Sequence, residues 1–353
     1  MNTETLMSTS PRVALLILTW NRRDDVLRCV ASLSRLTYPN YVPVVVDNAS
    51  RDDSVAALRS RYPDLAIIEN PRNLGYAGGN NVGIRWALAH GADYVQIINS
   101  DTEATPEMIT ALVDVAESDP RIAVVGCRNV LMEDPTRLWG AYGLLTYGPF
   151  VVRTAGQGSA DGSEWRVVRD ADWVIGNGYL WRRAALESIG LLDEQFFGYH
   201  EDVDWCLRAR QAGYRVVYAG TAAIVHRGAS SSDDHHTRSF PASYFLGRNG
   251  VLLVRKHGRP RERVRFAVLC GAALAARWLR ALLLQLLPRH TRARARAASL
   301  ATFEARFSRG VLDAIRHRPI PFARLGMSDA VDPAAGPGGV PRSSGGVSTA
   351  EGR

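Results

Sequence analysis

Hydrophobic and polar positions alternate in blocks over the first 125 residues of the chain. Short runs rich in Val, Ile and Leu predict strands over residues 13–18, 42–47, 65–69, 94–98 and 122–125. Between them, apolar residues recur at helical spacing, which predicts helices over residues 24–36, 52–61, 79–90 and 106–118. Strands that are apolar throughout and alternate with helices are typical of a parallel sheet covered on both faces. We therefore predict an α/β fold with a mostly parallel central sheet flanked by helices.

The pattern changes twice in the rest of the chain. Residues 128–172 are rich in Gly, Trp and Tyr and show no clear period, whereas residues 173–248 contain a second organised block. That block predicts a strand, then a helix that begins near Asp202 and ends at Gly213, and then a strand over 214–218. Residues 327–353 are mostly Gly, Pro, Ser and Ala, a composition that predicts disorder.

Composition and charge exclude several classes of protein. Hydrophobic residues make up 46% and charged residues 22%, which excludes a wholly disordered, collagen-like or coiled-coil chain. The net charge is +8, and residues 255–309 hold 14 basic but only two acidic residues. The four cysteines are far apart and form no CxxC pair, so we expect neither a disulfide framework nor a zinc site, and we expect a reducing compartment.

The most apolar segment, residues 266–287, raises the question of a membrane. Its longest uncharged run is 266–276, well short of the roughly 20 residues that span a bilayer. The first 12 residues lack the layout of a secretion signal, and we expect no transmembrane helix. Arg277 and Arg280 lie three residues apart, hence on one helical face, where both side chains could reach lipid headgroups. Two interpretations stay open: a helix that packs on the core, and a helix that lies on a membrane surface.

Polar, turn-forming residues follow four of the predicted strands. Because ligands bind beyond the carboxyl ends of strands in open α/β sheets, we expect these residues to line a nucleotide pocket, although each could simply cap a helix. The candidates are Thr19, Asp47, Arg72, Asn73, Gly79, Asn99 and Asp101. Gly79 would allow the backbone to approach a ligand closely, or it could simply belong to a turn. No GxGxxG motif follows the first strand, which argues against a dehydrogenase-type dinucleotide fold.

Acidic residues gather again in the second block. Glu201, Asp202 and Asp204 begin the predicted helix, where acids compensate the helix dipole, and Asp204 can pair with Arg208 one turn later. A carboxylate at such a loop-to-helix junction can also act as a general base toward a hydroxyl. Further along, His226 ends an apolar strand and, like most single histidines, could be purely structural.

Taken together, these segments resemble family 2 inverting glycosyltransferases with the GT-A fold, especially bacterial rhamnosyltransferase-like members. The resemblance covers about two thirds of the chain in the family's order. The matching segments are ILTWNR (17–22), VVVDNASRDDS (44–54), NPRNLGYAGGNNVGI (70–84), INSD (98–101), the stretch 176–216 that contains FFGYHEDVDW, IVHRG (224–228) and SYFLGRNGVLLVRKHG (243–258).

The resemblance implies a role for each matching position. Thr19 and Asp47 would line the nucleoside site, with Arg72, Asn73, Gly79 and Asn99 nearby. Asp101 matches the last acid of the family's DxD metal motif, and His226 matches a histidine that contacts the same Mg²⁺ or Mn²⁺ ion. Asp202 falls on the catalytic base and Glu201 on its partner acid. The chain departs from the family at Asn99, a neutral residue at the first DxD position, which weakens the expectation of a metal.

The resemblance also implies an organisation and a set of partners. A flexible N-terminus (1–12) would precede a catalytic domain (13–258) with a nucleotide-binding half (13–125) and an acceptor half (126–258). A basic amphipathic helical extension (259–326) and the tail would follow. The donor would be a dTDP- or UDP-sugar, with dTDP-rhamnose favoured, and the acceptor a cell-surface glycan or a polyprenyl-diphosphate-linked saccharide.

These implications place the enzyme in the cytoplasm, on the inner face of the cell membrane. Two alternatives belong to other classes. A nucleotidyltransferase would share the sheet and a metal-held diphosphate, but not the base-like helix with its distant His226. A nucleic-acid-binding protein would explain the basic segment, but that segment has few aromatic residues for stacking.

Overall fold

The computed structural model describes residues 10–227, 242–285, 292–325, 327 and 330. Twelve strands and nine helices fall within these residues. The strands are β1 (Val13–Thr19), β2 (Tyr41–Asp47), β3 (Ala66–Glu69), β4 (Tyr94–Asn99), β5 (Thr102–Ala104), β6 (Ile122–Leu131), β7 (Leu138–Gly140), β8 (Gly143–Leu145), β9 (Val152–Thr154), β10 (Val168–Asp170), β11 (Tyr179–Arg182) and β12 (Arg215–His226). The helices are α1 (Arg23–Ser32), α2 (Ser54–Arg61), α3 (Gly75–Ala89), α4 (Met108–Glu117), α5 (Arg183–Ile189), α6 (Glu201–Gln211), α8 (Ala242–His257), α9 (Pro260–Gln285) and α10 (Arg292–Ile315).

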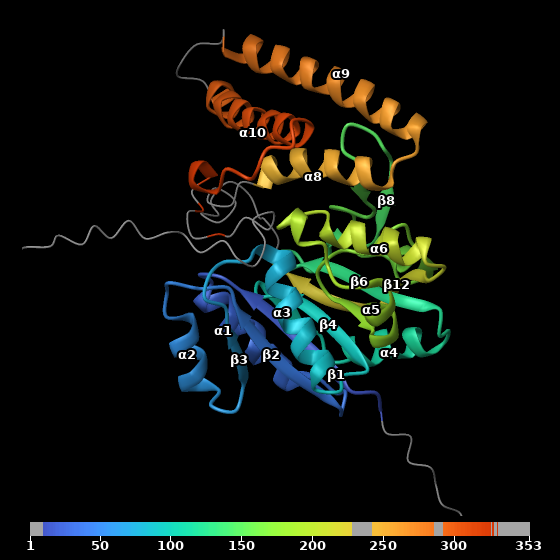
Figure 1. Ribbon diagram of the computed structural model, residues 1–353. Coiled ribbons are helices and arrows are strands. Elements are labelled where there is room, and N and C mark those ends of the chain that lie inside the picture. The colour runs from blue at the N-terminus through green and yellow to red at the C-terminus, as the bar shows by residue number, and fades with distance from the viewer. Residues whose placement is uncertain (1–9, 228–241, 286–291, 326, 328–329, 331–353) are drawn as a thin grey trace, which may run out of the picture.

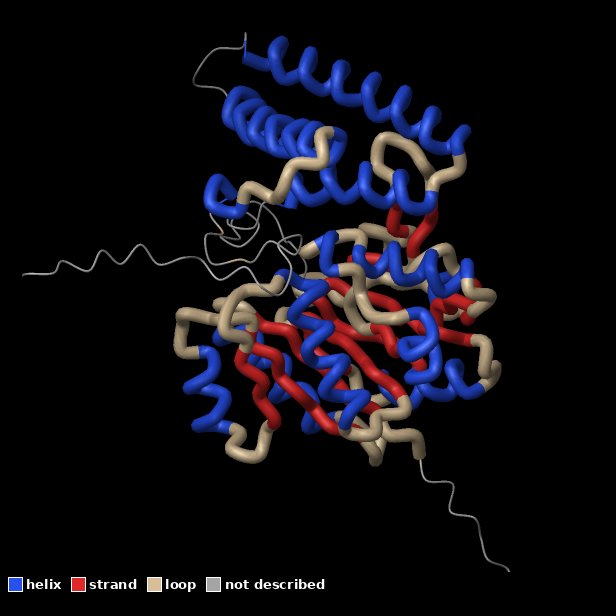
Figure 2. Tube along the Cα trace, in the orientation of Figure 1, coloured by secondary structure: helices blue, strands red, loops and turns tan. Residues whose placement is uncertain are grey.

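One large sheet organises the molecule, with helices on both of its faces (Figures 1 and 2). Its strand order is β10-β12-β6-β11-β4-β1-β2-β3, and β5 and β7 pair with β12 and β6. The predicted strands β1 to β4 pair in parallel. The sheet as a whole is mixed, because β11 lies antiparallel between β4 and β6.

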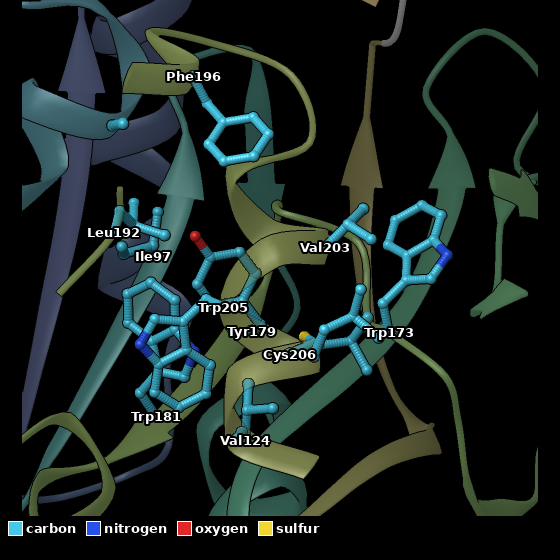
Figure 3. Packing of buried hydrophobic residues seen from close by; sticks show 14 of the residues in the cluster. Ile97, Val124, Trp173, Tyr179, Trp181, Leu192, Phe196, Val203, Trp205 and Cys206 are labelled. Atoms are coloured by element: carbon cyan, nitrogen blue, oxygen red, sulfur yellow. The ribbon is translucent and has the colours of Figure 1, made fainter. Parts of the chain in front are cut away.

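Successive side chains of β1 are buried on opposite faces of the sheet, because side chains alternate between the two faces along a strand. Val13, Leu15 and Ile17 pack with the residues of α1 and α4. Ala14 and Leu16 belong to the second core, beneath α3, α5 and α6. Figure 3 shows the centre of this second core, where Trp181 and Trp205 meet with ring centroids 5.0 Å apart.

Helix α3 begins four residues before the predicted start, because its glycines are packing positions rather than a turn. Gly75 has a φ of +73°, and any Cβ there would strike Phe197. At Gly79 a Cβ would lie 2.6 Å from Leu18 Cδ1, and at Gly83 it would lie 3.0 Å from Leu16. The absence of side chains therefore lets α3 approach β1 closely.

The last three described helices stack beyond the edge of α6 (Figure 1). Helices α8 and α10 cross in close contact, since a Cβ on Gly247 or Gly310 would strike the backbone of the other helix. Within residues 259–326, most of the described part of the chain lies in α9 and α10. The domain boundary at 258/259 stays a prediction, and residues 1–9 and 331–353 lie outside the described part of the chain.

Candidate active site

Three buried oxygen atoms line the carboxyl-terminal edge of the sheet. Thr19 pairs with Asp47 across β1 and β2, and Leu18 pairs with Asn99 across β1 and β4. Within the described residues, Thr19 Oγ1, Asp47 Oδ1 and Asn99 Oδ1 are buried and have no hydrogen-bond partner. Such atoms are rare in folded proteins and call for an explanation. A polar ligand over this edge supplies one.

An asparagine network shapes the loop that follows β3. Asn48 Nδ2 donates to Asn73 Oδ1 at 2.8 Å and to the Gly75 carbonyl at 3.0 Å, while Asn48 Oδ1 accepts from Asn70 Nδ2 at 3.1 Å. Asn73 therefore holds the loop through its side-chain oxygen, and Arg72 beside it is exposed. Sequence reasoning missed Asn48, whose only signal is its place directly after Asp47.

Asp101 and His226 meet at the same edge from distant parts of the chain. His226 Nε2 lies 3.3 Å from Asp101 Oδ1, and the Arg227 amide donates to the Asp101 carbonyl at 3.0 Å. Antiparallel pairing of β5 with β12 sets His226 opposite Thr102. Burial alone would raise the pKa of Asp101, but His226 and Arg22 hold it below its ordinary value. Asp101 is therefore a carboxylate at neutral pH.

This pair suits a hard divalent cation only in part. A carboxylate and an imidazole are suitable ligands, and the unpartnered Asn99 Oδ1 is a neutral oxygen on the same strand end. The described residues contain no cluster of three or more His, Cys, Asp or Glu side chains that could hold a metal. Since Mg²⁺ is commonly held by one or two carboxylates together with phosphate oxygens, the residues fit a cation shared with a bound diphosphate.

A two-residue bridge, Gly176–Asn177, links this edge to the acidic helix. The Gly176 amide donates to Asp202 Oδ2 at 2.8 Å, and the Asn99 amide donates to Asn177 Oδ1 at 2.9 Å. The Tyr76 hydroxyl, from α3, donates to the Gly176 carbonyl. The bridge exists because antiparallel β11 runs back along β4, which sequence reasoning did not predict.

The loop before α6 is strained and held from two sides. Phe197, Tyr199 and His200 have φ angles of 61°, 67° and 70°, which non-glycine residues rarely adopt. The Phe197 carbonyl accepts from the Tyr76 and Ala77 amides of α3. From α8, Asn249 Nδ2 donates to the carbonyls of Phe196, Gly198 and Tyr199, each at 2.8 Å. Strain of this kind gathers at functional sites and is sustained by surrounding contacts.

The strained loop leads directly into Glu201 and Asp202, whose surroundings differ. Burial and the charge of Asp202 raise the pKa of Glu201 well above its ordinary value, and its Oε2 has no partner among the described residues. Burial also raises the pKa of Asp202, to about 6, but the Val203 and Gly176 amides oppose that rise. Of the two, Asp202 therefore ionises more readily and is the carboxylate that can act as a base.

The charges of Glu201 and Asp101 both act on Tyr199. Burial, then Glu201 and then Asp101, raise the pKa of its phenol to about 12. Both carboxylates therefore act on one ring, although they lie 100 residues apart in sequence. The structure brings together Asp101, His226, Glu201 and Asp202, with Thr19, Asp47 and Asn99 along the same edge.

Asp204 points away from these residues and is structural. Its buried carboxylate contacts Arg208 Nε at 2.9 Å, Lys256 Nζ at 2.8 Å and His257 Nε2 at 2.7 Å. The predicted pairing with Arg208 is confirmed, and Lys256 and His257 add a bond between α6 and α8. Burial would raise the pKa of Asp204, but these partners lower it.

Comparisons with known proteins agree with this architecture. The model of glycosyl transferase family 2 matches residues 14–173, and that of glycosyl transferase family group 2 matches residues 94–307. N-acetylglucosaminyl-diphospho-decaprenol L-rhamnosyltransferase of Mycobacterium tuberculosis is 30% identical over 249 residues, covering 64% of this chain and 78% of that protein. The low-salt glycan biosynthesis hexosyltransferase Agl10 of Haloferax volcanii is 26% identical over 226 residues, covering 61% of this chain and 66% of that protein.

Two solved structures share the fold at low identity. A mannosyltransferase from Pyrobaculum calidifontis, in complex with GDP-Man and Mn²⁺, has a TM-score of 0.53 and 18% identity, covering 87% of this chain and 88% of its own. GalNAc-T7 with UDP, GalNAc and Mn²⁺ has a TM-score of 0.59 and 14% identity, covering 89% of this chain and 59% of its own. At this identity the likeness concerns the fold alone.

Proposed function

Because the chain belongs to glycosyl transferase family 2 and is a GT-A-fold glycosyltransferase that uses nucleotide-sugar donors, we propose that it inverts the anomeric carbon of a hexose during transfer. The observation that carries this proposal is the Gly176–Asn177 bridge, which ties Asp202 to the strand end of Asn99. Family membership favours sugar transfer over nucleotidyl transfer and over nucleic-acid binding.

The donor nucleoside would lie over β1 and β2. Thr19 Oγ1 and Asp47 Oδ1 are buried polar atoms that a base or ribose could satisfy. Arg72 and Asn73 form the adjacent loop, and Asn99 ends the next strand. Gly79 contributes by packing on Leu18 and Asn48, which keeps β1 and the asparagine network in place.

Transfer would then follow from the positions of the carboxylates. Asp202 accepts the proton of the acceptor hydroxyl, whose oxygen attacks the anomeric carbon from the face opposite the diphosphate. The carbon–oxygen bond to the diphosphate breaks, and the nucleoside diphosphate leaves with the bonding pair. Glu201 ionises less readily than Asp202, because burial and the charge of Asp202 raise its pKa, and this limits the negative charge beside the base. A divalent cation, Mg²⁺ or Mn²⁺, held by Asp101 and His226, would supply positive charge to the diphosphate when bound.

The finer assignment of substrates is drawn from the Mycobacterium tuberculosis relative. Its name states transfer of L-rhamnose to an N-acetylglucosaminyl-diphospho-decaprenol. We infer dTDP-rhamnose as the favoured donor for this chain and a polyprenyl-diphosphate-linked saccharide as the favoured acceptor. Such an acceptor would be presented at the cytoplasmic leaflet of the cell membrane, which is where we place the enzyme.

Helix α9 carries a surface suited to that location. Seven large apolar side chains of α9 are between 37% and 64% exposed: Val264, Val268, Leu269, Trp278, Leu279, Leu282 and Leu283. Only a narrow stripe that includes Phe266 and Cys270 is buried against the rest of the protein. No helix in the described part of the chain is long and apolar enough to cross a membrane. A helix with an exposed apolar face of this kind is suited to lie parallel to a lipid surface.

The arginines of α9 differ from the sequence-based expectation. Arg277 does not share the exposed face with Arg280, because it lies over the Phe150 ring at 4.5 Å and pairs with Glu304 at 3.6 Å. Arg261, Arg265 and Arg280 are exposed and remain available to anionic headgroups, whereas Arg263 donates to the Gly258 and Arg255 carbonyls, each at 2.8 Å.

We expect the full chain to sediment with anionic vesicles at low salt. Leu279→Gln with Leu282→Gln should weaken that binding by roughly tenfold or more, since each buried leucine contributes about 1.5–3 kcal/mol. The matched control, Leu312→Gln with Ile315→Gln, removes two exposed apolar side chains from α10. Equal vesicle binding by both double variants, or none by the unaltered chain, would rule out α9 as the docking surface.

A panel of nucleotide sugars tests the proposed reaction. Purified protein is incubated with each donor and a diphosphate-linked N-acetylglucosaminyl acceptor, and released nucleoside diphosphate is measured. We expect release from dTDP-rhamnose in an acceptor-dependent manner. If nucleoside diphosphate is released only from another nucleotide sugar, that sugar is the donor instead of dTDP-rhamnose. If it is released from none of them, the proposed reaction is wrong.

A further inference from the structure

A buried carboxylate beside the candidate active site holds three arginines. Asp25, on α1, is 5% exposed. Its oxygens contact Arg22 Nη1 at 3.1 Å, Arg227 Nη1 at 2.9 Å and the guanidinium of Arg28. One carboxylate that gathers three guanidinium groups leaves the cluster positively charged.

Two of the three arginines are placed next to Asp101. Arg227 directly follows His226, and its amide donates to the Asp101 carbonyl at 3.0 Å. Arg22 follows β1 and shares the Asp25 carboxylate with Arg227, which brings the two guanidinium groups together at this end of the sheet. Arg28 stands one turn further along α1 and is 43% exposed. The side chains of Arg22 and Arg227 are 17% and 33% exposed, so each retains some accessible surface.

The local charge favours an anion at this point. Asp25 and Asp101 provide two negative charges, whereas Arg22, Arg28 and Arg227 provide three positive ones. Asn99 is neutral, so it adds no negative charge that would attract the arginine side chains away from a bound anion. Guanidinium groups match phosphate oxygens in geometry and bind them more strongly than neutral donors do.

We propose that Arg22 and Arg227 form a cradle for the diphosphate of the donor and stabilise it as it leaves, with Asp25 as the positioning residue for both. The cradle supplies charge that a metal held by Asp101 and His226 would otherwise supply alone. This inference rests on the proposed function, because it assumes a nucleoside diphosphate over this edge of the sheet.

Binding without metal tests the cradle apart from catalysis. dTDP, dTMP, UDP and UMP are titrated by calorimetry in excess chelator against the unaltered chain, Arg22→Gln, Arg227→Gln and the control Arg28→Gln. We expect the unaltered chain to prefer a diphosphate to the matching monophosphate by roughly tenfold or more, in line with charge-assisted hydrogen bonds. Arg22→Gln and Arg227→Gln should abolish most of this preference, and Arg28→Gln should keep it.

The outcomes separate the cradle from a purely structural cluster. Equal losses in all three variants would mean that the arginines only hold Asp25, and an unchanged preference in Arg227→Gln would also overturn the inference. Asp25→Asn should weaken the diphosphate preference as much as the two arginine variants do. If the unaltered chain binds none of the nucleotides, with or without metal, the proposed function itself fails, and the cradle with it.

Discussion

Replacing Asp202 with Asn should lower the turnover number by about 10²–10⁴-fold while nucleoside diphosphate affinity changes little. The amide keeps the size of the carboxylate but cannot take a proton from the acceptor. Steady-state kinetics measures turnover, and calorimetry with dTDP measures binding. Asparagine keeps only one acceptor oxygen, so either the Gly176 or the Val203 amide loses its partner, and thermal unfolding of the variant is measured beside the kinetics.

The same residue sets the pH dependence of the rate. Burial raises the pKa of Asp202 to about 6, and the base must be unprotonated to act. The turnover number should therefore be level above this pKa and fall as the pH drops below it, with this limb absent from Asp202→Asn. Glu201→Gln is the matched comparison, because it removes the other carboxyl group of the pair and keeps the size of the side chain. Near-normal turnover in Asp202→Asn with a large loss in Glu201→Gln would exchange their roles.

Removal of divalent cations should be the second large effect. We expect excess chelator to lower the rate by about 10²-fold or more, because a metal at the diphosphate contributes several kcal/mol. Asp101→Asn should reproduce much of this loss and raise the Mg²⁺ or Mn²⁺ concentration needed for half-maximal activity. His226→Gln should act in the same direction but less strongly, as a second ligand would.

The arginine cradle sets a limit on that loss. Some activity should persist in chelator, and Arg227→Gln should remove most of the remainder. Full activity of metal-free protein, or an Asp101→Asn variant with unchanged metal dependence, would contradict the metal assignment.

Sequence periodicity was sufficient for the parallel half of the sheet. The predicted strands and helices up to residue 118 correspond to β1–β4 and α1–α4. Each of these elements is marked by its own sequence, either by an apolar run or by apolar residues at helical spacing. Strand β11 follows a stretch without clear period and owes its antiparallel place to β4 and β6 on either side. The sequence predicted a strand in this block, but only tertiary pairing sets its direction, on which the Gly176–Asn177 bridge depends.

The order of the motifs along the chain correctly indicated the family. It did not indicate the surroundings of the acidic residues. The acids at the start of α6 look alike in sequence. Asp204 is structural because α8 brings Lys256 and His257 to it from more than 50 residues away. Asp25 has Arg22 and Arg28 three residues away on either side, but Arg227 joins them only through the fold, at the end of β12.

The anomeric configuration of the product tests the central claim most directly. The purified enzyme is supplied with its best donor from the panel and a saccharide acceptor, and the first-formed product is examined by proton NMR. A single displacement with Asp202 as the base predicts a glycosidic bond of inverted configuration relative to the donor, formed by the unaltered chain and not by Asp202→Asn. A product that retains the donor's configuration would contradict the account.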